Sequence, residues 1–302
     1  MYINQKTISD QISFEGIGLH SGDPVKIFLI PEDINHGIIF SYNNQSIKAS
    51  WKNAIISQLC TKIKNEKFYL STIEHLMSAL SGLGITNLTI KVDSNEMPIL
   101  DGSSYEYVNK ILEAGIIDQN INQKILKIKK KVSYKLDEKY IEIEPNNKDS
   151  LTIDYTIDYK DEFIKKQTLS YEHNFEEYQK IYMARTFCLH KDLEKIFSMG
   201  LAKGGSLDNA IVVSGNKILN QGGLRYPDEF VKHKVLDCVG DLYLAEHQIW
   251  GHVTTYGGGH ELNLMLLKEI FQNEKNYELI EANSENKVLS KNNESKLKIA
   301  SL

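Results

Sequence analysis

The sequence predicts an α+β protein with two domains. The chain has 302 residues, of which 41% are hydrophobic and 25% charged, so it can fill the cores of two medium-sized domains. Segments that alternate apolar and polar residues, typical of half-buried strands, are interspersed with segments of helical period. This order roughly repeats after a basic, polar stretch at residues 120–131, which predicts a junction between a domain at 1–120 and a domain at 125–282.

The first domain begins with alternating residues around several glycines, which predict paired strands within residues 14–30. Apolar residues at helical spacing predict a helix over residues 71–83, and Ser71 and Glu74 fit a capping box at its start. A strand and then an amphipathic helix are predicted over residues 85–93 and 103–115.

The second domain shows the same two periodicities. Strands are predicted over residues 124–136, 140–145, 151–159, 209–215 and 249–256. Helices are predicted over residues 175–182, 192–199, 229–245 and 261–272. The remaining segment, 283–302, is rich in Asn, Ser, Lys and Glu, and we expect it to form a flexible polar tail.

Charge and cysteine content restrict the kind of partner. A net charge of -5 argues against nucleic-acid binding, which normally requires a surplus of Lys and Arg. We found neither a signal peptide nor an apolar run long enough to span a bilayer, so we expect a cytoplasmic protein. Cys60, Cys188 and Cys238 form no CxxC pair, which predicts free thiols and leaves His and carboxylate as the metal ligands available.

One predicted helix, at residues 229–245, carries a polar stripe. His233, Asp237 and Asp241 are four residues apart and therefore share one face of a helix that is otherwise strongly apolar. Buried charges need partners or a metal ion. Taken alone, the stripe is explained more simply by a His and Asp pair on a solvated face.

A second candidate site lies in the helix at residues 71–83, where Glu74 precedes His75. Two His and one Asp would leave a tetrahedral zinc ion with one open position, the usual layout of a catalytic zinc site. Glu74 could then act as general base for a zinc-bound water. The capping role explains Glu74 equally well, so the residues alone leave both interpretations open.

His260 follows three glycines at the start of the last predicted helix. Histidine is the side chain best able to carry a proton near neutral pH, and glycines let a ligand approach the backbone. A histidine after glycines is nevertheless more often a turn or cap residue. Gly205 and Ser206 are likewise only a turn signal on this evidence.

Six segments taken together resemble the bacterial UDP-3-O-acyl-N-acetylglucosamine deacetylases. They occur in that family's order, between about residue 3 and residue 272. The segments are EGIGLHSG (15–22), STIEHL (71–76), PILDGS (98–103), ARTF (184–187), KGGSLDNAIV (203–212) and FVKHKVLDCVGDL (230–242).

The resemblance implies a fold and a reaction. The fold is a pair of α+β domains whose helices are sandwiched between two sheets, with the active site at the domain interface. The reaction is hydrolysis of the N-acetyl group of UDP-3-O-(3-hydroxyacyl)-N-acetylglucosamine, the committed step of lipid A synthesis. The resemblance implies one Zn²⁺ ion per chain, with Fe²⁺ left open, and a monomer is expected.

The resemblance also implies roles for single residues. His75, His233 and Asp237 would bind zinc. Glu74 would be the base, His260 would stabilise the oxyanion and protonate the leaving amine, Asp241 would orient His260, and Thr186 would hold the acetyl carbonyl. The residues expected to contact the substrate are Lys234, Lys139, Phe187, Leu201, Gly205 and Ser206.

The chain departs from the family pattern at Gly257, where many relatives carry a basic residue three positions before the histidine. The cation that replaces it is therefore an open question. The dehydratase domain sometimes fused to this enzyme is expected to be absent. Two alternatives are a sugar-nucleotide binding protein with a structural metal and a metal-dependent phosphoesterase, but neither accounts for all six segments.

Overall fold

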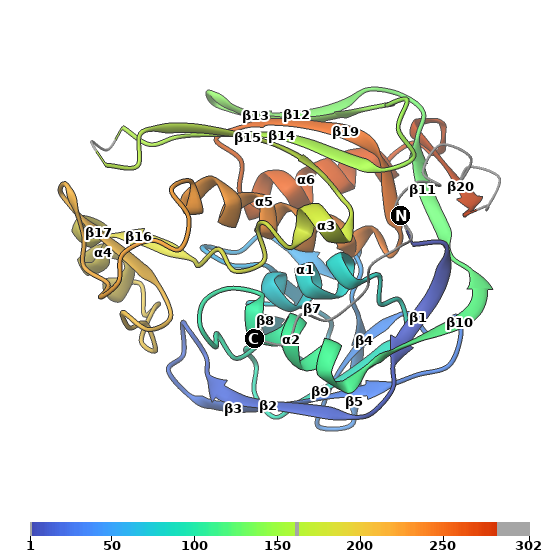
Figure 1. Cartoon of the computed structure of the whole chain (residues 1–302), viewed down its shortest axis with the longest axis horizontal. Helices are drawn as coiled ribbons and strands as arrows, with labels where there is room; N and C mark the ends of the chain where they lie inside the picture. Colours follow the sequence, from blue (N-terminus) through green and yellow to red (C-terminus); the bar gives the residue numbers. More distant parts are fainter. Residues whose placement is uncertain (1, 161–162, 283–302) are drawn as a thin grey trace.

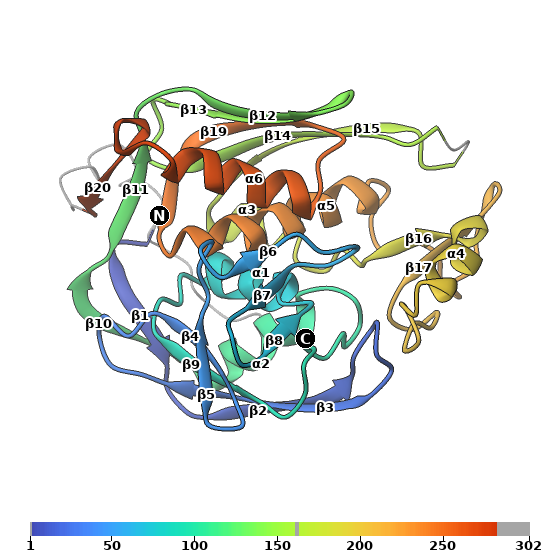
Figure 2. The ribbon, with the colours of Figure 1, turned by 180° about the vertical axis from the view of Figure 1, so that it is seen from behind.

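The computed structural model describes residues 2–160 and 163–282, so the segment predicted as a tail lies outside the described residues. The predicted α+β class is confirmed, because helices and several sheets are mixed along the chain. Figure 1 shows a layer of helices that includes α1, α5 and α6 between two sheets, and Figure 2 shows the same layers from behind.

The sheet of the first half has the strand order β2-β3-β9-β4-β5. Val25, Ile27 and Leu29 alternate along β3 and are buried, which confirms the paired strands predicted from their spacing. The bounds are β2 Ile12–Ile17, β3 Pro24–Pro31, β4 Ile38–Tyr42, β5 Gln45–Lys48 and β9 Leu88–Val92.

Two smaller sheets of the first half were not predicted. Their strands are short or run as a ribbon at the edge of the fold, so they offer little periodicity. One is a two-stranded ribbon of β1 (Asn4–Ile8) and β10 (Ile116–Asn122). The other has three strands, β6 (Ala54–Ile55), β7 (Lys62–Lys64) and β8 (Tyr69–Ser71).

The second large sheet has seven strands centred on β19. The strand predicted over residues 124–136 is divided, because its first part pairs with β19 and β20 and its second part with β13. The bounds are β11 Lys124–Ile128, β12 Val132–Leu136, β13 Lys139–Glu144, β14 Leu151–Asp158, β15 Lys166–Glu172, β19 Gln248–Tyr256 and β20 Tyr277–Glu281. The domain limits 1–120 and 125–282 stay a prediction.

A third, small unit lies at one end of the helical layer (Figures 1 and 2). Its strands are ordered β16-β17-β18, and a short helix, α4, follows the first of them. The bounds are β16 Phe187–Leu189, β17 Ile211–Ser214, β18 Lys217–Ile218 and α4 Leu193–Ser198, with a 3₁₀ turn, η1, at His190–Asp192.

The predicted helices are present with adjusted ends. The bounds are α1 Glu74–Leu83, α2 Tyr105–Ala114, α3 Phe175–Tyr178, α5 Glu229–Leu242 and α6 His260–Phe271, with 3₁₀ turns η2 at Tyr243–Ala245 and η3 at Glu274–Asn276. Within residues 2–160 and 163–282, these helices include none that is long and apolar enough to cross a membrane.

The capping box predicted at the start of α1 is wrong. The helix begins at Glu74, its N-cap residue is Ile73, and no side chain caps it. Ser71 ends strand β8 instead, and its hydroxyl donates to the carbonyl oxygen of Asn95 (3.2 Å). Tertiary contacts therefore override the local pattern, and the Glu74 carboxylate is left for another role.

Candidate active site

The centre of the site is the contact between α1 and α5. All ten residues of α1 are buried, and so are most of those of α5. A Cβ atom at Gly240 would overlap the carbonyl oxygen of Glu74, so a glycine is what lets the two backbones touch. This contact brings side chains that are far apart in the sequence to one buried point.

The three predicted metal ligands meet there. One ligand atom from each of His75, His233 and Asp237 lies within 4.8 Å of the others. Asp237 Oδ1 is 3.6 Å from His75 Nε2 and 3.3 Å from His233 Nε2. His233 and Asp237 are 1% and 2% exposed, which excludes the alternative of a solvated helix face.

The hydrogen bonds of these residues leave their inner atoms available. His233 Nδ1 donates to the carbonyl oxygen of Ala184 (3.0 Å), so Nε2 carries the lone pair that faces the cluster. Asp237 Oδ1 is buried without a hydrogen-bond partner in the described part of the chain. A buried carboxylate oxygen with no donor is expensive, and a cation beside it would remove that cost.

Electrostatics favour the protonation states in which His233 and Asp237 can bind a metal ion. Burial lowers the pKa of His233 to about 3, against the attraction of Asp237, so the ring is neutral. Burial alone would raise the pKa of Asp237, but the Lys234 ammonium, 2.9 Å from Asp237 Oδ2, holds it well below its usual range. A neutral imidazole and an ionised carboxylate are the forms that bind a metal ion.

Glu74 lies beside the cluster. Its Oε2 accepts a hydrogen bond from the backbone N–H of Thr61 (3.0 Å), and its Oε1 is 3.8 Å from His260 Nε2. Burial raises the pKa of Glu74 to about 7, although His260 and His75 act in the opposite direction. A carboxyl group with a pKa near neutrality is suited to accept a proton from water.

His260 is oriented by Asp241. His260 Nδ1 is 2.8 Å from Asp241 Oδ2, and the same oxygen accepts a hydrogen bond from Asn263 Nδ2 (2.8 Å). Burial alone would lower the pKa of His260, but Asp241 and Glu74 outweigh it and raise the pKa to about 9. The ring is therefore a cation at neutral pH, with Nε2 directed towards the cluster.

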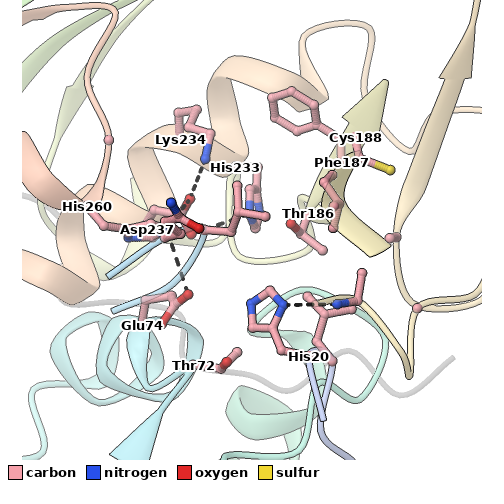
Figure 3. Close-up of a pocket in the computed structure, with 18 of the residues that line it drawn as sticks. His20, Thr72, Glu74, Thr186, Phe187, Cys188, His233, Lys234, Asp237 and His260 are labelled. Carbon is pink, nitrogen blue, oxygen red and sulfur yellow. Dashed lines mark hydrogen bonds and ion pairs between the residues drawn. The ribbon is translucent and has the colours of Figure 1, made fainter. Parts of the chain in front are cut away.

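Thr186 approaches the same space from a loop that precedes β16 (Figure 3). Its N–H donates to the carbonyl oxygen of Gly102 (2.7 Å), and its own carbonyl oxygen accepts from Ile211 (2.8 Å). The preceding residue, Arg185, is held by a buried ion pair with Glu229 (2.9 Å). The loop is therefore anchored on both sides of the Thr186 hydroxyl.

A cavity of about 1070 Å³ lies over this site and is lined by Glu74, His75, Thr186, His233, Asp237 and His260. Among the residues expected to contact the substrate, Lys139, Phe187, Gly205, Ser206 and Lys234 line it. Lys234 Nζ is 2.9 Å from Asp237 Oδ2 and 5.6 Å from the centre of the Phe187 ring. Figure 3 shows Lys234, Phe187 and Thr186 around the space next to Asp237.

One arm of the cavity is apolar. Its wall comes from α4, from the small unit around β17 and from the loop before β7, with the residues Leu193, Ile196, Phe197, Met199, Leu207, Leu219, Ile56 and Leu59. Phe197 and Met199 are 53% and 40% exposed, so the arm opens to solvent. Met199 and Ala202 line the cavity. Leu201, which was expected to contact the substrate, is not among the described residues that line it.

Lys139 packs against Gly257, the position at which the sequence departs from the family pattern. A Cβ atom at Gly257 would lie 2.9 Å from Lys139 Cγ, so the lysine stem packs over this glycine. Both residues line the cavity. The absence of a side chain at residue 257 therefore makes room for a cation from a neighbouring strand.

Two residues that sequence reasoning did not single out belong to the site. Thr61 contacts Glu74, Asp241 and His260. His20 lines the cavity, and its Nε2 is buried without a hydrogen-bond partner in the described residues. His20 could have been found within the segment EGIGLHSG, whereas Thr61 has no local signal.

A buried His₂Asp cluster with a carboxylate and an Asp-paired histidine beside it is typical of single-metal hydrolases. The family model of UDP-3-O-acyl N-acetylglycosamine deacetylase matches residues 5–272. The chain belongs to this family. It is similar to the UDP-3-O-acyl-N-acetylglucosamine deacetylase of Campylobacter hominis, with 42% identity over 281 residues, covering 92% of this chain and 95% of the relative. It is 41% identical to the enzyme of the same name from Campylobacter fetus subsp. fetus, with the same coverage.

Proposed function

We propose that this chain hydrolyses the N-acetyl group of UDP-3-O-(3-hydroxyacyl)-N-acetylglucosamine and releases acetate, as a step of lipid A synthesis. One observation carries the proposal. His75, His233 and Asp237 form a buried cluster beside Glu74 and His260 at the base of a cavity with an apolar arm. Membership of the deacetylase family supports the substrate.

The residues fit a zinc ion. Two imidazole nitrogens and one carboxylate oxygen are ligands that zinc prefers, and three protein ligands leave a position open for chemistry. Asp237 Oδ1, which has no hydrogen-bond partner among the described residues, and the outward hydrogen bond of His233 Nδ1 support this use. The same donors accept Fe²⁺, so metal analysis must decide between the two ions.

When bound, such an ion acts as a Lewis acid that polarises the amide carbonyl and acidifies water. The chain supplies the proton transfers. Glu74 Oε1 accepts the proton of the attacking water, while its Oε2 stays fixed by Thr61. Protonated His260, oriented by Asp241, stabilises the developing oxyanion and then gives its Nε2 proton to the leaving amine.

Thr186 completes the proposed site by donating a hydrogen bond from its hydroxyl to the oxyanion. A pre-oriented donor of this kind favours the transition state over the substrate, because the negative charge develops only during the reaction. Its loop is anchored by the Arg185–Glu229 pair, so the hydroxyl needs little reorganisation.

We assign the two ends of the substrate to two parts of the cavity. Lys234 and Lys139 are the cations for the diphosphate, with Lys139 standing at Gly257 in place of the missing basic residue. The apolar arm takes the acyl chain, with Phe187, Met199 and Ala202 in its wall. Gly205 and Ser206 contact the sugar or the acyl ester.

We also propose a monomeric, cytoplasmic protein. The free thiols of Cys60, Cys188 and Cys238 suit a reducing compartment. Size-exclusion chromatography with light scattering tests the first part, and fractionation of cells that express the protein tests the second. A dimer at working concentration would contradict the proposed state.

Acetate release tests the proposed activity. Purified chain should release one acetate per acylated UDP-sugar, lose activity when its metal is chelated, and regain it with Zn²⁺ or Fe²⁺. UDP-N-acetylglucosamine without the acyl chain serves as the control substrate and should react far more slowly. Metal-loaded protein that binds the acylated substrate but releases no acetate would favour the alternative of a sugar-nucleotide binding protein.

A further inference from the structure

Thr61 lies where the three helices of the site meet. It precedes β7 and is 7% exposed. Its carbonyl oxygen accepts a hydrogen bond from Thr72 N–H (3.0 Å), and its N–H donates to Glu74 Oε2 (3.0 Å). The backbone of Thr61 is therefore tied both to the segment that leads into α1 and to the first side chain of α1.

The side chain of Thr61 points to the other two helices. Its hydroxyl donates to Asp241 Oδ1 on α5, and its oxygen is 3.1 Å from His260 Nδ1 on α6. The hydroxyl has a single proton, which Asp241 receives, so the oxygen is an acceptor towards the ring. His260 Nδ1–H thus faces two acceptors, Asp241 Oδ2 and Thr61 Oγ1, and these two define the plane of the ring.

We infer that Thr61 is a positioning residue that sets the separation and orientation of Glu74 and His260 through one backbone and one side-chain hydrogen bond. The inference rests on the proposed function, because the separation of Glu74 and His260 matters only if these two residues transfer protons in the reaction. Fixing Glu74 Oε2 leaves Oε1 free to face His260 Nε2, at 3.8 Å. Fixing the Asp241 carboxylate and the ring keeps Nε2 directed at the same point.

A purely structural role makes a different prediction. Threonine and valine have nearly the same shape, so Thr61→Val keeps the volume and the backbone bonds but removes the hydroxyl. If Thr61 only fills the core, this change alters stability and leaves turnover per folded molecule intact. If Thr61 positions the Asp241–His260 pair, turnover falls while substrate binding and metal content stay the same.

The test compares Thr61→Val with Thr61→Ser, which keeps the hydroxyl, and with Thr7→Val as a matched control. Thr7 is also buried, and its hydroxyl donates to the Asn87 carbonyl oxygen (2.7 Å) away from the site. We expect Thr61→Val to lower kcat by about tenfold to a hundredfold, the effect of losing one hydrogen bond to a charged group. KM and metal content should change little in Thr61→Val. The kcat of Thr61→Ser should stay close to that of wild type. If Thr61→Val does not fold, Thr61→Ala replaces it.

Two further measurements separate this inference from the proposed function. In an Asp241→Asn background, Thr61→Val should add little to the loss of turnover, because both changes act on His260. The Nδ1 proton resonance of His260, recorded by NMR on ¹⁵N-histidine-labelled protein, should shift in Thr61→Val but not in Thr61→Ser, whatever the substrate proves to be.

The inference is overturned if folded, metal-loaded Thr61→Val turns over at the wild-type rate. It is equally overturned if Thr61→Ser loses as much as Thr61→Val, or if the full loss persists in the Asp241→Asn background. Wild-type protein that releases no acetate would refute the proposed function. In that case an unchanged Nδ1 resonance in Thr61→Val would refute the role of Thr61 separately.

Discussion

Replacing Glu74 by glutamine separates proton transfer from every other contribution of this side chain. Glutamine has nearly the same shape, and its amide oxygen can still accept the hydrogen bond from Thr61 N–H (3.0 Å). What the variant loses is the ability to accept a proton from water. Loss of a general base typically costs on the order of a hundredfold to ten-thousandfold in rate, so kcat of Glu74→Gln should fall by about that amount.

The same substitution predicts a rise in stability, and the sign follows from the pKa of Glu74. Burial raises that pKa from 4.5 to about 7, so the folded protein holds this proton more tightly than the unfolded chain does. Stability from this group is therefore present at low pH and is lost as the pH rises from 4.5 through about 7. At higher pH the ionised group destabilises the metal-free protein on the order of 3 kcal/mol, which glutamine removes.

A helix-capping role for Glu74 would give the opposite sign. Losing a cap costs about 1 kcal/mol and leaves turnover per folded molecule nearly intact. Turnover, metal content and melting temperature should therefore be measured on the same preparations, with Glu246→Gln as a control for the loss of a carboxylate outside the site. Glu246 follows η2, binds Lys48 and Ser50, and is not among the described residues that line the cavity. A Glu74→Gln enzyme that keeps its metal and most of its activity would refute the assignment of the base.

Other predictions concern the metal, the pH profile and the substrate. Active protein should hold about one metal ion per chain, and the His75→Ala and His233→Ala variants should lose it. If elemental analysis finds the same amount of tightly bound metal in these variants, the assignment of the ligands is wrong. Activity should rise as Glu74 ionises, with an apparent pKa at or below about 7, and should fall as His260 deprotonates near pH 9. A flat kcat/KM profile between pH 6 and 10 would contradict the roles of both groups. Lys234→Ala should raise KM and weaken its salt dependence while it retains the metal. Lys232→Ala on the same helix should retain the metal and change neither KM nor its salt dependence. Equal Michaelis constants for Lys234→Ala and wild type would exclude Lys234 as a diphosphate contact.

The helix that carries most of the cluster could be predicted from the sequence because its signal is local. Apolar residues of helical period locate α5, and spacing alone places His233, Asp237 and Asp241 on one face. Whether that face is solvated or buried is a tertiary property. The structure shows that all three side chains are buried. The pattern of residues along one helix cannot predict this burial.

Local patterns failed where a side chain has a distant partner. Ser71 and Glu74 match a capping box, but Ser71 completes a strand and Glu74 binds Thr61, which lies 13 residues earlier in the chain. The strands β6, β7 and β8 have only two or three residues each, too few to show a period. Thr61 itself stands beside β7 without any feature that would mark it in the sequence.

The closeness of the catalytic groups depends on a residue that contributes no chemistry. Gly240 lies between Asp237 and Asp241 in the chain, and its missing Cβ lets α5 touch the backbone of α1 at Glu74. A larger residue would push the helices apart and separate His75 on one helix from His233 and Asp237 on the other. A search for titratable side chains passes over such a glycine, although the distance of 3.6 Å between His75 Nε2 on α1 and Asp237 Oδ1 on α5 depends on it. The sequence therefore encodes the chemistry of the site in its polar residues and the geometry of the site in a glycine, whose role is visible only when both helices are seen together.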